Sequence, residues 1–173
     1  MSDSFFAPEP LGDHHQLDGF TCGVESLDDW LVKKARTNSA SGASRVFVVC
    51  DDQDTVVAYY SLSTGAVVRR DLPRKFRQGT PDPVPVLLIG RFAVASNHQK
   101  EGLGYSMAQD ALLRCERLLN EVAFMFVMLH PVNDAADTWW RRNGFISAPT
   151  EEPMLLLPIS QLAEMRAGSD RTP

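Results

Sequence analysis

Hydrophobic residues recur at two different spacings along this chain, and each change of spacing predicts a new element. Apolar residues three and four apart in SLDDWLVKKA predict a helix over 26–35. Ser26 is its expected N-cap, with Asp29 three residues later. Runs rich in β-branched and aromatic residues follow at 45–50 and 55–68, and the polar turn between them predicts an antiparallel hairpin.

The second half of the chain alternates strand-like and helix-like patterns. PVLLIGRFAVA at 85–95 predicts a strand, and Gly90 inside it indicates a bulge or a close backbone approach. Apolar residues three and four apart then predict an amphipathic helix that ends near Leu119. Three more elements are expected: a buried central strand at 122–129, a short helix at 134–143 ended by Gly144, and a strand at 154–159. This order predicts a mixed α/β fold.

Three segments lack such a pattern. Residues 1–17 and 69–85 contain prolines and glycines without periodicity, which predicts irregular chain with at most a short helix. We expect a single domain over 1–162 and a flexible tail over 163–173.

Composition narrows the class of protein. A chain of 173 residues, 44% hydrophobic and 23% charged, suffices for one globular domain. No apolar run approaches the roughly 20 residues that span a bilayer, and the N-terminus lacks a secretory signal pattern. We therefore expect a cytoplasmic protein with no membrane association. Cys22, Cys50 and Cys115 are widely spaced and form no C-x-x-C pair, so we expect buried thiols and no metal.

The net charge argues against extensive coating of nucleic acid but allows contacts from a local cluster of cations. A formal net charge of −5 argues against wholesale coating of nucleic acid. The densest cationic cluster, RRDLPRKFRQ, is either a solvated loop, which is the slightly favoured alternative, or a source of phosphate contacts. The candidate RNA-binding cations are Lys33, Lys34, Arg36, Arg69, Arg70, Arg74, Lys75, Arg77, Arg141 and Arg142.

A glycine-rich turn joins the strand at 85–95 to the next helix. Gln99, Gly102 and Gly104 spell Q-x-x-G-x-G, which aims backbone N–H groups at one point beside the positive end of the helix dipole. A phosphate or pyrophosphate suits such a turn, although the pattern alone is common. The G-x-G-x-x-G order of a dinucleotide fingerprint is missing.

Together, RFAVA, this turn, FMFVML and N-x-x-A-x-x-x-W-x-x-x-G-F resemble the GCN5-related N-acetyltransferase (GNAT) family. The resemblance implies a central, mixed, mostly antiparallel twisted sheet with a splayed strand pair, flanked by helices. It also implies an acetyl-CoA-dependent N-acetyltransferase. The phrases LGDHHQLDGFTCGVESLDDWL, VVAYYSLS, PVPVLLIGRFAV and EEPMLLLPISQL are similar to the acetyltransferase toxins of bacterial toxin–antitoxin pairs.

This narrower resemblance implies acetylation of the α-amino group of the amino acid on a charged tRNA, which blocks translation. The implied partners are aminoacyl-tRNA and a ribbon-helix-helix antitoxin, with operator DNA contacted only through the antitoxin. A homodimer is left open.

The resemblance also assigns roles to residues. Backbone groups of Phe92, Ala93 and Val94 should hold the pantetheine arm, with Val94 at the thioester carbonyl. Asn133 is either a polar cofactor contact or a plain helix N-cap. The expected cofactor-binding residues are Phe92, Ala93, Val94, Gln99, Lys100, Glu101, Gly102, Leu103, Gly104, Tyr105 and Asn133.

One position departs from the family. Many relatives place a tyrosine four residues ahead of the glycine in their last motif, where its phenol protonates the departing sulfur. Here that position is Trp140, whose indole N–H donates hydrogen bonds but no proton near neutral pH. We therefore expect protonation to be slowed or rerouted, while Trp139 packs in the core. Tyr59 and Tyr60 lie on a strand and are expected to pack.

Two other side chains, Arg91 and His130, have two interpretations each. Arg91 either contacts substrate or pairs with a carboxylate, and the pair is the favoured alternative. His130 is either a base or, as favoured, a hydrogen-bonded structural residue. His14 and His15 are expected at the surface.

Three functions therefore compete. The first is an active toxin-type acetyltransferase. The second is an acetyltransferase for a small amine or protein amine, with a merely solvated basic loop. The third is a catalytically impaired acetyl-CoA-binding homologue that acts with an antitoxin as a repressor.

Overall fold

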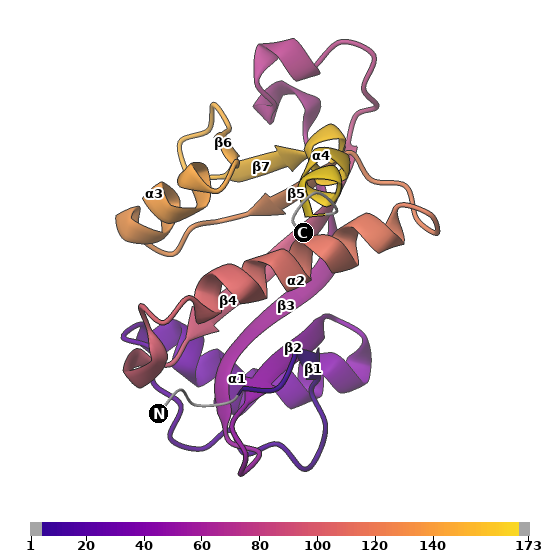
Figure 1. Ribbon diagram of the computed structural model, residues 1–173. Helices are drawn as coiled ribbons and strands as arrows, with labels where there is room; N and C mark the ends of the chain where they lie inside the picture. Colours follow the sequence, from indigo (N-terminus) through magenta and orange to yellow (C-terminus); the bar gives the residue numbers. More distant parts are fainter. Residues whose placement is uncertain (1–4, 170–173) are drawn as a thin grey trace. The chain divides into compact units, whose positions relative to one another are not determined.

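The computed structural model describes residues 5–169 as two compact units. Unit 1 is drawn from Met1–Ser63 and Gly90–Ala111, and unit 2 from Thr64–Ile89 and Leu112–Pro173. A seven-stranded sheet has the order β1-β2-β3-β4-β5-β7-β6 (Figure 1). The strands are β1 (Glu9–Pro10), β2 (Arg45–Cys50), β3 (Val56–Val67), β4 (Val84–Val94), β5 (Phe126–Leu129), β6 (Ile146–Ser147) and β7 (Leu155–Pro158). The helices are α1 (Glu25–Ser41), α2 (Leu103–Leu118), α3 (Asp134–Arg142) and α4 (Ile159–Ser169), with short 3-10 turns η1 (Arg69–Asp71), η2 (Arg74–Phe76) and η3 (Ser96–His98).

This architecture confirms the mixed α/β fold with a mostly antiparallel sheet flanked by helices. Strand β2 pairs antiparallel with β1 and β3, and β7 pairs antiparallel with β5 and β6. The pairing of β4 with β5 is parallel. Among the described helices, none is long and apolar enough to cross a membrane.

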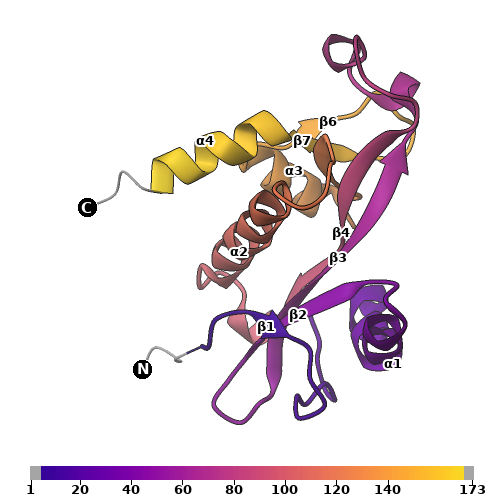
Figure 2. The same cartoon turned by 90° about the vertical axis from the view of Figure 1, so that its right-hand side faces the viewer.

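Unit 1 is built on the predicted hairpin. β2 and β3 pair antiparallel, with Phe47 opposite Tyr60 and a register shift between Val49 and Cys50. Helix α1 lies on one face of this hairpin (Figure 2). Its buried residues, at three- and four-residue spacings, join the same apolar cluster as the strands: Leu27, Leu31 and Ala35.

The expected start and end of α1 are wrong. Its N-cap is Val24, which provides no side-chain cap, and the carboxylate of Asp28 instead accepts the N–H of Cys22 at 2.9 Å. The helix continues to Ser41, and its residues after position 35 are exposed or half-buried. It ends at Gly42, whose φ of 81° is in the left-handed region.

Unit 2 is centred on β5, as the continuous apolar run predicted. All four residues of β5 are buried, and the strand pairs with β7 on its antiparallel side. Helices α3 and α4 both contact β7. The segment between β3 and β4 carries only the two 3-10 turns η1 and η2, which matches the predicted loop (Figure 1).

Three short or terminal elements were not predicted. β1 and β6 have two residues each, too few for a period to show, and they gain hydrogen bonds only from a neighbouring strand. α4 follows β7 directly and extends to Ser169, within the tail predicted to be flexible. Residues 170–173 lie outside the described part of the chain, and the flexibility of the tail remains a prediction.

The cysteines follow the prediction. Cys22, Cys50 and Cys115 are free and buried. Burial raises the pKa of Cys22 to about 11 and that of Cys50 and Cys115 to about 12. These thiols are packing residues, not nucleophiles.

Candidate functional site

The glycine-rich turn ahead of α2 has the conformation that anion binding requires. Lys100 and Gly102 have φ values of 68° and 80°, and left-handed residues at alternate positions turn successive N–H groups toward one point. In the part of the chain that the structure describes, the N–H groups from Lys100 to Gly104 donate to no carbonyl. The first bond beyond them runs from the Ser106 N–H to the Gly102 carbonyl at 3.1 Å. A pyrophosphate fits these free donors at the positive end of the α2 dipole.

The side chain of Gln99 ties this turn to two neighbouring segments. Its side-chain amide donates to the carbonyls of Cys22 and Val94, each at 2.9 Å. Both amide hydrogens are thereby used, so the side chain holds the turn against the N-terminal segment and the end of β4. The carbonyl of Val94 accepts from Gln99, and its N–H is the group that can donate to a thioester oxygen, as the prediction requires.

An acidic side chain lies within the turn. Glu101 is half exposed, and its carboxylate is 3.4 Å from Nδ1 of His98. Phe5 packs edge-on against the His98 ring at 5.0 Å. Tyr105, in the first turn of α2, is 53% exposed and accepts a hydrogen bond from Gln109 at 2.8 Å. A carboxylate beside an anion site weakens binding there, and a protonated His98 would offset it.

The end of β4 approaches β3 closely. A Cβ at Gly90 would lie 3.1 Å from the hydroxyl oxygen of Ser61, which explains the glycine and confirms the predicted close approach. Ala93 is buried and Phe92 is half-buried. The N–H of Ala95 donates to the carbonyl of Val57 at 2.8 Å, which fixes the point where the strand leaves the sheet.

A buried polar pair connects β3 to α2 within unit 1. Tyr60 is fully buried, and its hydroxyl donates to the Asp110 carboxylate at 2.5 Å. Sequence reasoning placed Tyr60 correctly in the packing but missed this partner. The one available signal was an aspartate between the buried Met107 and Ala111 on the apolar side of the helix.

Arg91 has an aromatic neighbour where a carboxylate was favoured. Its guanidinium carbon lies 5.4 Å from the centroid of the Trp30 ring, and among the described residues no acidic side chain pairs with it. Trp30 stacks on Tyr59 with centroids 6.0 Å apart. The described residues therefore do not provide the carboxylate partner that was favoured for Arg91.

Two other cations of unit 1 are already engaged. Lys33 pairs with Asp29 at 3.2 Å along the surface of α1. Arg36 donates to the carbonyls of Gly12 and His15 at 2.8 and 2.6 Å, so it fastens the N-terminal loop to α1. This bonding weakens the case for Arg36 as an RNA contact.

The basic loop of unit 2 contains cations of two kinds. Arg69 and Arg77 donate to the loop carbonyls of Thr80 and Leu72 at 3.2 and 2.8 Å, which gives them a structural role. The more available cations are exposed: Arg70, whose side chain is 84% accessible, Arg74, and Lys75, which lies over the Phe76 ring.

Trp139 was the tryptophan expected in the core, but Trp140 is the more deeply buried of the two. Trp140 is 4% exposed and packs edge-to-face against Trp139 and Phe145, with centroids 4.8 and 5.1 Å away. Trp139 is only half-buried. Arg141 pairs with Asp137 one turn earlier in α3, whereas Arg142 is exposed.

Asn133 and His130 both have structural contacts. The side chain of Asn133 accepts the N–H of Ala136 at 2.9 Å, which is the N-cap alternative. Nδ1 of His130 lies 3.2 Å from the carbonyl of Pro153, which matches the structural interpretation of this histidine.

His15 is 2% exposed, so its expected surface position is wrong. The Gly12 N–H donates to His15 Nδ1 at 2.8 Å, which places the ring proton on Nε2, 2.7 Å from Glu9. With His14, these residues offer metal-ligating atoms within 4.8 Å of one another. A metal on Nε2 would require a proton on Nδ1, where Gly12 already donates, so the cluster is explained as a hydrogen-bond network.

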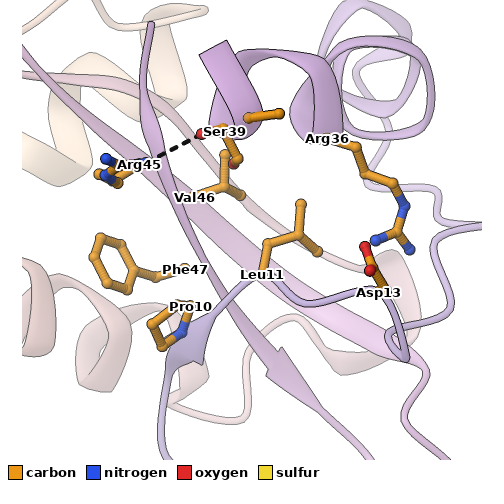
Figure 3. Close-up of a pocket in the computed structure, with 9 residues that line it drawn as sticks. Pro10, Leu11, Asp13, Arg36, Ser39, Arg45, Val46 and Phe47 are labelled. Atoms are coloured by element: carbon orange, nitrogen blue, oxygen red, sulfur yellow. Dashed lines mark hydrogen bonds between the residues drawn. The ribbon is translucent and has the colours of Figure 1, made fainter. Parts of the chain in front are cut away.

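A cavity of about 330 Å³ adjoins this network (Figure 3). It is lined by the N-terminal loop, α1 and β2, and Arg45 donates across it to the carbonyl of Ser39 at 3.0 Å. Arg36, also in its wall, is engaged with the loop. Both guanidinium groups therefore serve the fold.

Comparison with known proteins identifies relatives over most of the chain. The acetyltransferase (GNAT) family matches residues 13–145. The tRNA-acetylating toxin of Mycobacterium tuberculosis is 36% identical over 153 residues, which cover 88% of this chain and 92% of the relative.

Solved structures share the fold. AtaT complexed with acetyl-methionyl-tRNAfMet superposes with a TM-score of 0.87 at 22% identity, covering 94% of this chain and 99% of that one. A mutant AtaT bound to the C-terminus of the antitoxin AtaR and acetyl-CoA gives 0.80 at 21% identity, covering 95% and 99%. The KacTA–DNA complex gives 0.78 at 20% identity, covering 95% and 99%.

Proposed function

Because the chain belongs to the GNAT family of acetyltransferases, we propose that it is a toxin that acetylates the α-amino group of the amino acid on charged tRNA and so blocks translation. The observation that carries the proposal is the identity of 36% with the tRNA-acetylating toxin of M. tuberculosis over 88% of this chain. A likeness over nearly the full length of both chains includes the acceptor side of the fold as well as the cofactor turn.

Acetyl-CoA fits the residues present. The free N–H groups from Lys100 to Gly104 would hold the pyrophosphate, and the backbone N–H of Val94 would donate to the thioester oxygen. When bound, the cofactor supplies an activated acetyl group. The chain supplies placement, which brings amine and thioester together without loss of further translational freedom.

Trp140 occupies the position where relatives often have a tyrosine acid. The thiol of acetyl-CoA would need no acid from this position, because a thiol with a pKa near the roughly 8.5 of cysteine is a far better leaving group than an alkoxide. The chemistry therefore tolerates an indole at this position, at some cost in rate.

The partners follow from the same assignment. A ribbon-helix-helix antitoxin binds the toxin, and operator DNA is contacted only through that antitoxin. The toxin acts in the cytoplasm, where charged tRNA is found, and self-association as a homodimer is part of the proposal. A gel-shift assay tests the DNA contact: the chain alone should not retard operator DNA, whereas the chain with its antitoxin should.

Labelled acetyl-CoA provides the direct test of the activity. Purified protein should transfer label to bulk charged tRNA, and the label should be released with the amino acid on mild alkaline deacylation. Uncharged tRNA is the matched control and should stay unlabelled. Label absent from charged tRNA would refute the proposal.

A second candidate is an impaired homologue that binds acetyl-CoA and represses through its antitoxin. The buried Trp140, which cannot act as an acid, is the observation that favours it. Binding of acetyl-CoA without acetylation of any amine, in the wild type and in Trp140→Tyr alike, would support this candidate over the first.

A further inference from the structure

Arg91 is fixed in place by an aromatic stack. Its guanidinium carbon lies 5.4 Å from the centroid of the Trp30 ring, and its Nη1 donates to the carbonyl of Gly90 at 2.9 Å. Trp30 in turn lies nearly parallel to Tyr59, at an interplanar angle of 7°. Tyr59 is fully buried, and its hydroxyl donates to the carbonyl of Leu27 at 2.6 Å. The surface beneath the guanidinium is therefore anchored in the core of unit 1.

The charge of Arg91 remains available to a ligand. The residue is exposed, and no carboxylate pairs with it in the part of the chain that the structure describes. One N–H is used by Gly90, and the others form the planar fork that matches a phosphate. Because the aromatic contact already restricts the side chain, binding an anion costs less conformational entropy than at a free arginine. Lys33 and Arg36, by contrast, are engaged within the fold.

The position of Arg91 suits the end of a charged tRNA. It is three residues ahead of Val94 on β4, which is about 10 Å along a strand. Arg91 and Ala93 share a face of this strand, and Ala93 belongs to the apolar cluster that includes α1. In aminoacyl-tRNA, a path of eight bonds leads from the α-amino nitrogen to the phosphorus joining the last two nucleotides, roughly 10 Å when extended. An amine that reaches Val94 brings this phosphate within reach of Arg91.

We propose that Arg91, held over the ring of Trp30, binds the phosphate between the last two nucleotides of the charged tRNA and thereby positions its aminoacyl end. Arg91 contacts the substrate, and Trp30 is a positioning residue that acts through Arg91. The inference rests on the proposed acetylation of charged tRNA.

A single neutral linkage in the substrate tests the contact. Charged tRNA with a methylphosphonate at that one linkage should lose about 10-fold in kcat/KM with the wild-type protein, as expected for a charge-assisted hydrogen bond. Arg91→Gln should lose about the same on normal tRNA and nothing further on the modified tRNA. Lys33→Gln, an exposed cation of α1 in the same unit, is the control and should keep the full sensitivity to the methylphosphonate.

Two outcomes separate the inference from the proposed function. If the wild type acetylates charged tRNA but the losses from Arg91→Gln and from the methylphosphonate multiply, Arg91 contacts another group and the inference is wrong. If the wild type acetylates no charged tRNA, the proposed function itself fails.

Substitutions that remove or keep an aromatic ring at position 30 test whether Trp30 positions Arg91. Trp30→Leu should raise KM for charged tRNA about threefold with little change in kcat, whereas Trp30→Phe should restore most of the loss because a ring remains under the guanidinium. KM for acetyl-CoA should be unchanged in both variants. Equal KM for charged tRNA in the wild type and Trp30→Leu would overturn the positioning role.

Discussion

Trp140 packs in the protein interior and also occupies a position where relatives often have a catalytic acid. Its ring is 4% exposed and fills the space between Trp139 and Phe145, so the indole has a structural reason to be there. Its position in the motif, however, is one that relatives often give to an acid. A substitution can separate the packing role from the chemical role because phenol and phenyl rings have nearly the same volume.

Trp140→Tyr should raise kcat for charged tRNA, by about 10-fold, if protonation of the thiolate limits turnover. Trp140→Phe is the matched control, since it loses the same ring volume without gaining a hydroxyl. Both variants should lose about 1–3 kcal/mol of unfolding free energy from the smaller ring. Equal kcat values for the Tyr and Phe variants under single-turnover conditions would show that protonation is not limiting.

The negative charge of Glu101 opposes its predicted role in binding the pyrophosphate of the cofactor. Its carboxylate lies in the turn proposed to bind pyrophosphate and is 3.4 Å from His98. Glu101→Gln should lower KM for acetyl-CoA about threefold at low salt, because a like charge is removed, and the gain should shrink as salt screens it. Glu121→Gln, an exposed acid of unit 2, is the control. A KM that is unchanged, or that rises, would show that Glu101 does not face the anion.

At the scale of elements, the turn before α2 and the end of α1 allow a direct comparison. Gly102 and Gly42 have φ values of 80° and 81°, and a Cβ at either would meet nothing within 4 Å. Alanine at each position should therefore cost about 1–2 kcal/mol of unfolding free energy through backbone strain alone. Only Gly102→Ala should also raise KM for acetyl-CoA, by about 10-fold, as the N–H groups lose alignment. Equal effects of the two variants on KM for acetyl-CoA would show that the turn does not bind the cofactor.

The basic loop between β3 and β4 should contribute to tRNA affinity through its exposed cations. Neutralising Arg74 and Lys75 together should weaken tRNA binding and lower the salt slope by about 0.7–0.9 for each phosphate that the loop no longer neutralises. Binding would be measured by filter retention at several salt concentrations. Arg77→Gln should mainly destabilise the loop, because its guanidinium holds the Leu72 carbonyl. An unchanged salt slope in the double variant would show that the loop is only solvated and makes no contact with tRNA phosphates.

Sequence periodicity predicted the elements whose stability comes from one continuous apolar face. The hairpin, β4, α2, β5, α3 and β7 all belong to this group. The glycine-rich turn was predicted from its glycines, of which Gly102 is left-handed, whereas the left-handed φ of Lys100 gave no signal in the sequence. Contacts between residues distant in sequence were not predictable. Gln99 meets Cys22, and Arg91 meets Trp30, only because the sheet brings these segments together. His15 was missed for a different reason: its partners Gly12 and Glu9 are close in sequence, but they lie in irregular chain where no periodicity marks a buried side chain.

At the scale of the whole molecule, the buried thiols make stability depend on alkaline pH. Burial raises the pKa of Cys22 to about 11 and that of Cys50 and Cys115 to about 12, from an ordinary value of 9.0. Between these values the unfolded chain has lost protons that the folded chain still holds. The free energy of unfolding should therefore be unaffected by these thiols below about pH 8.5, then fall progressively from about pH 9 to pH 12.

Cys115→Ala isolates one thiol from the other groups that titrate in this range. Cys115 is fully buried in α2, so the alanine variant should be less stable at pH 7.5 by about 1 kcal/mol through lost packing. Because alanine has no proton to hold, the stability gap between wild type and variant should narrow as pH rises above 9. Urea unfolding at half-unit steps from pH 7.5 to 10.5 measures this gap. A gap that stays constant would mean that Cys115 ionises equally easily in both states, and that burial does not protect its proton.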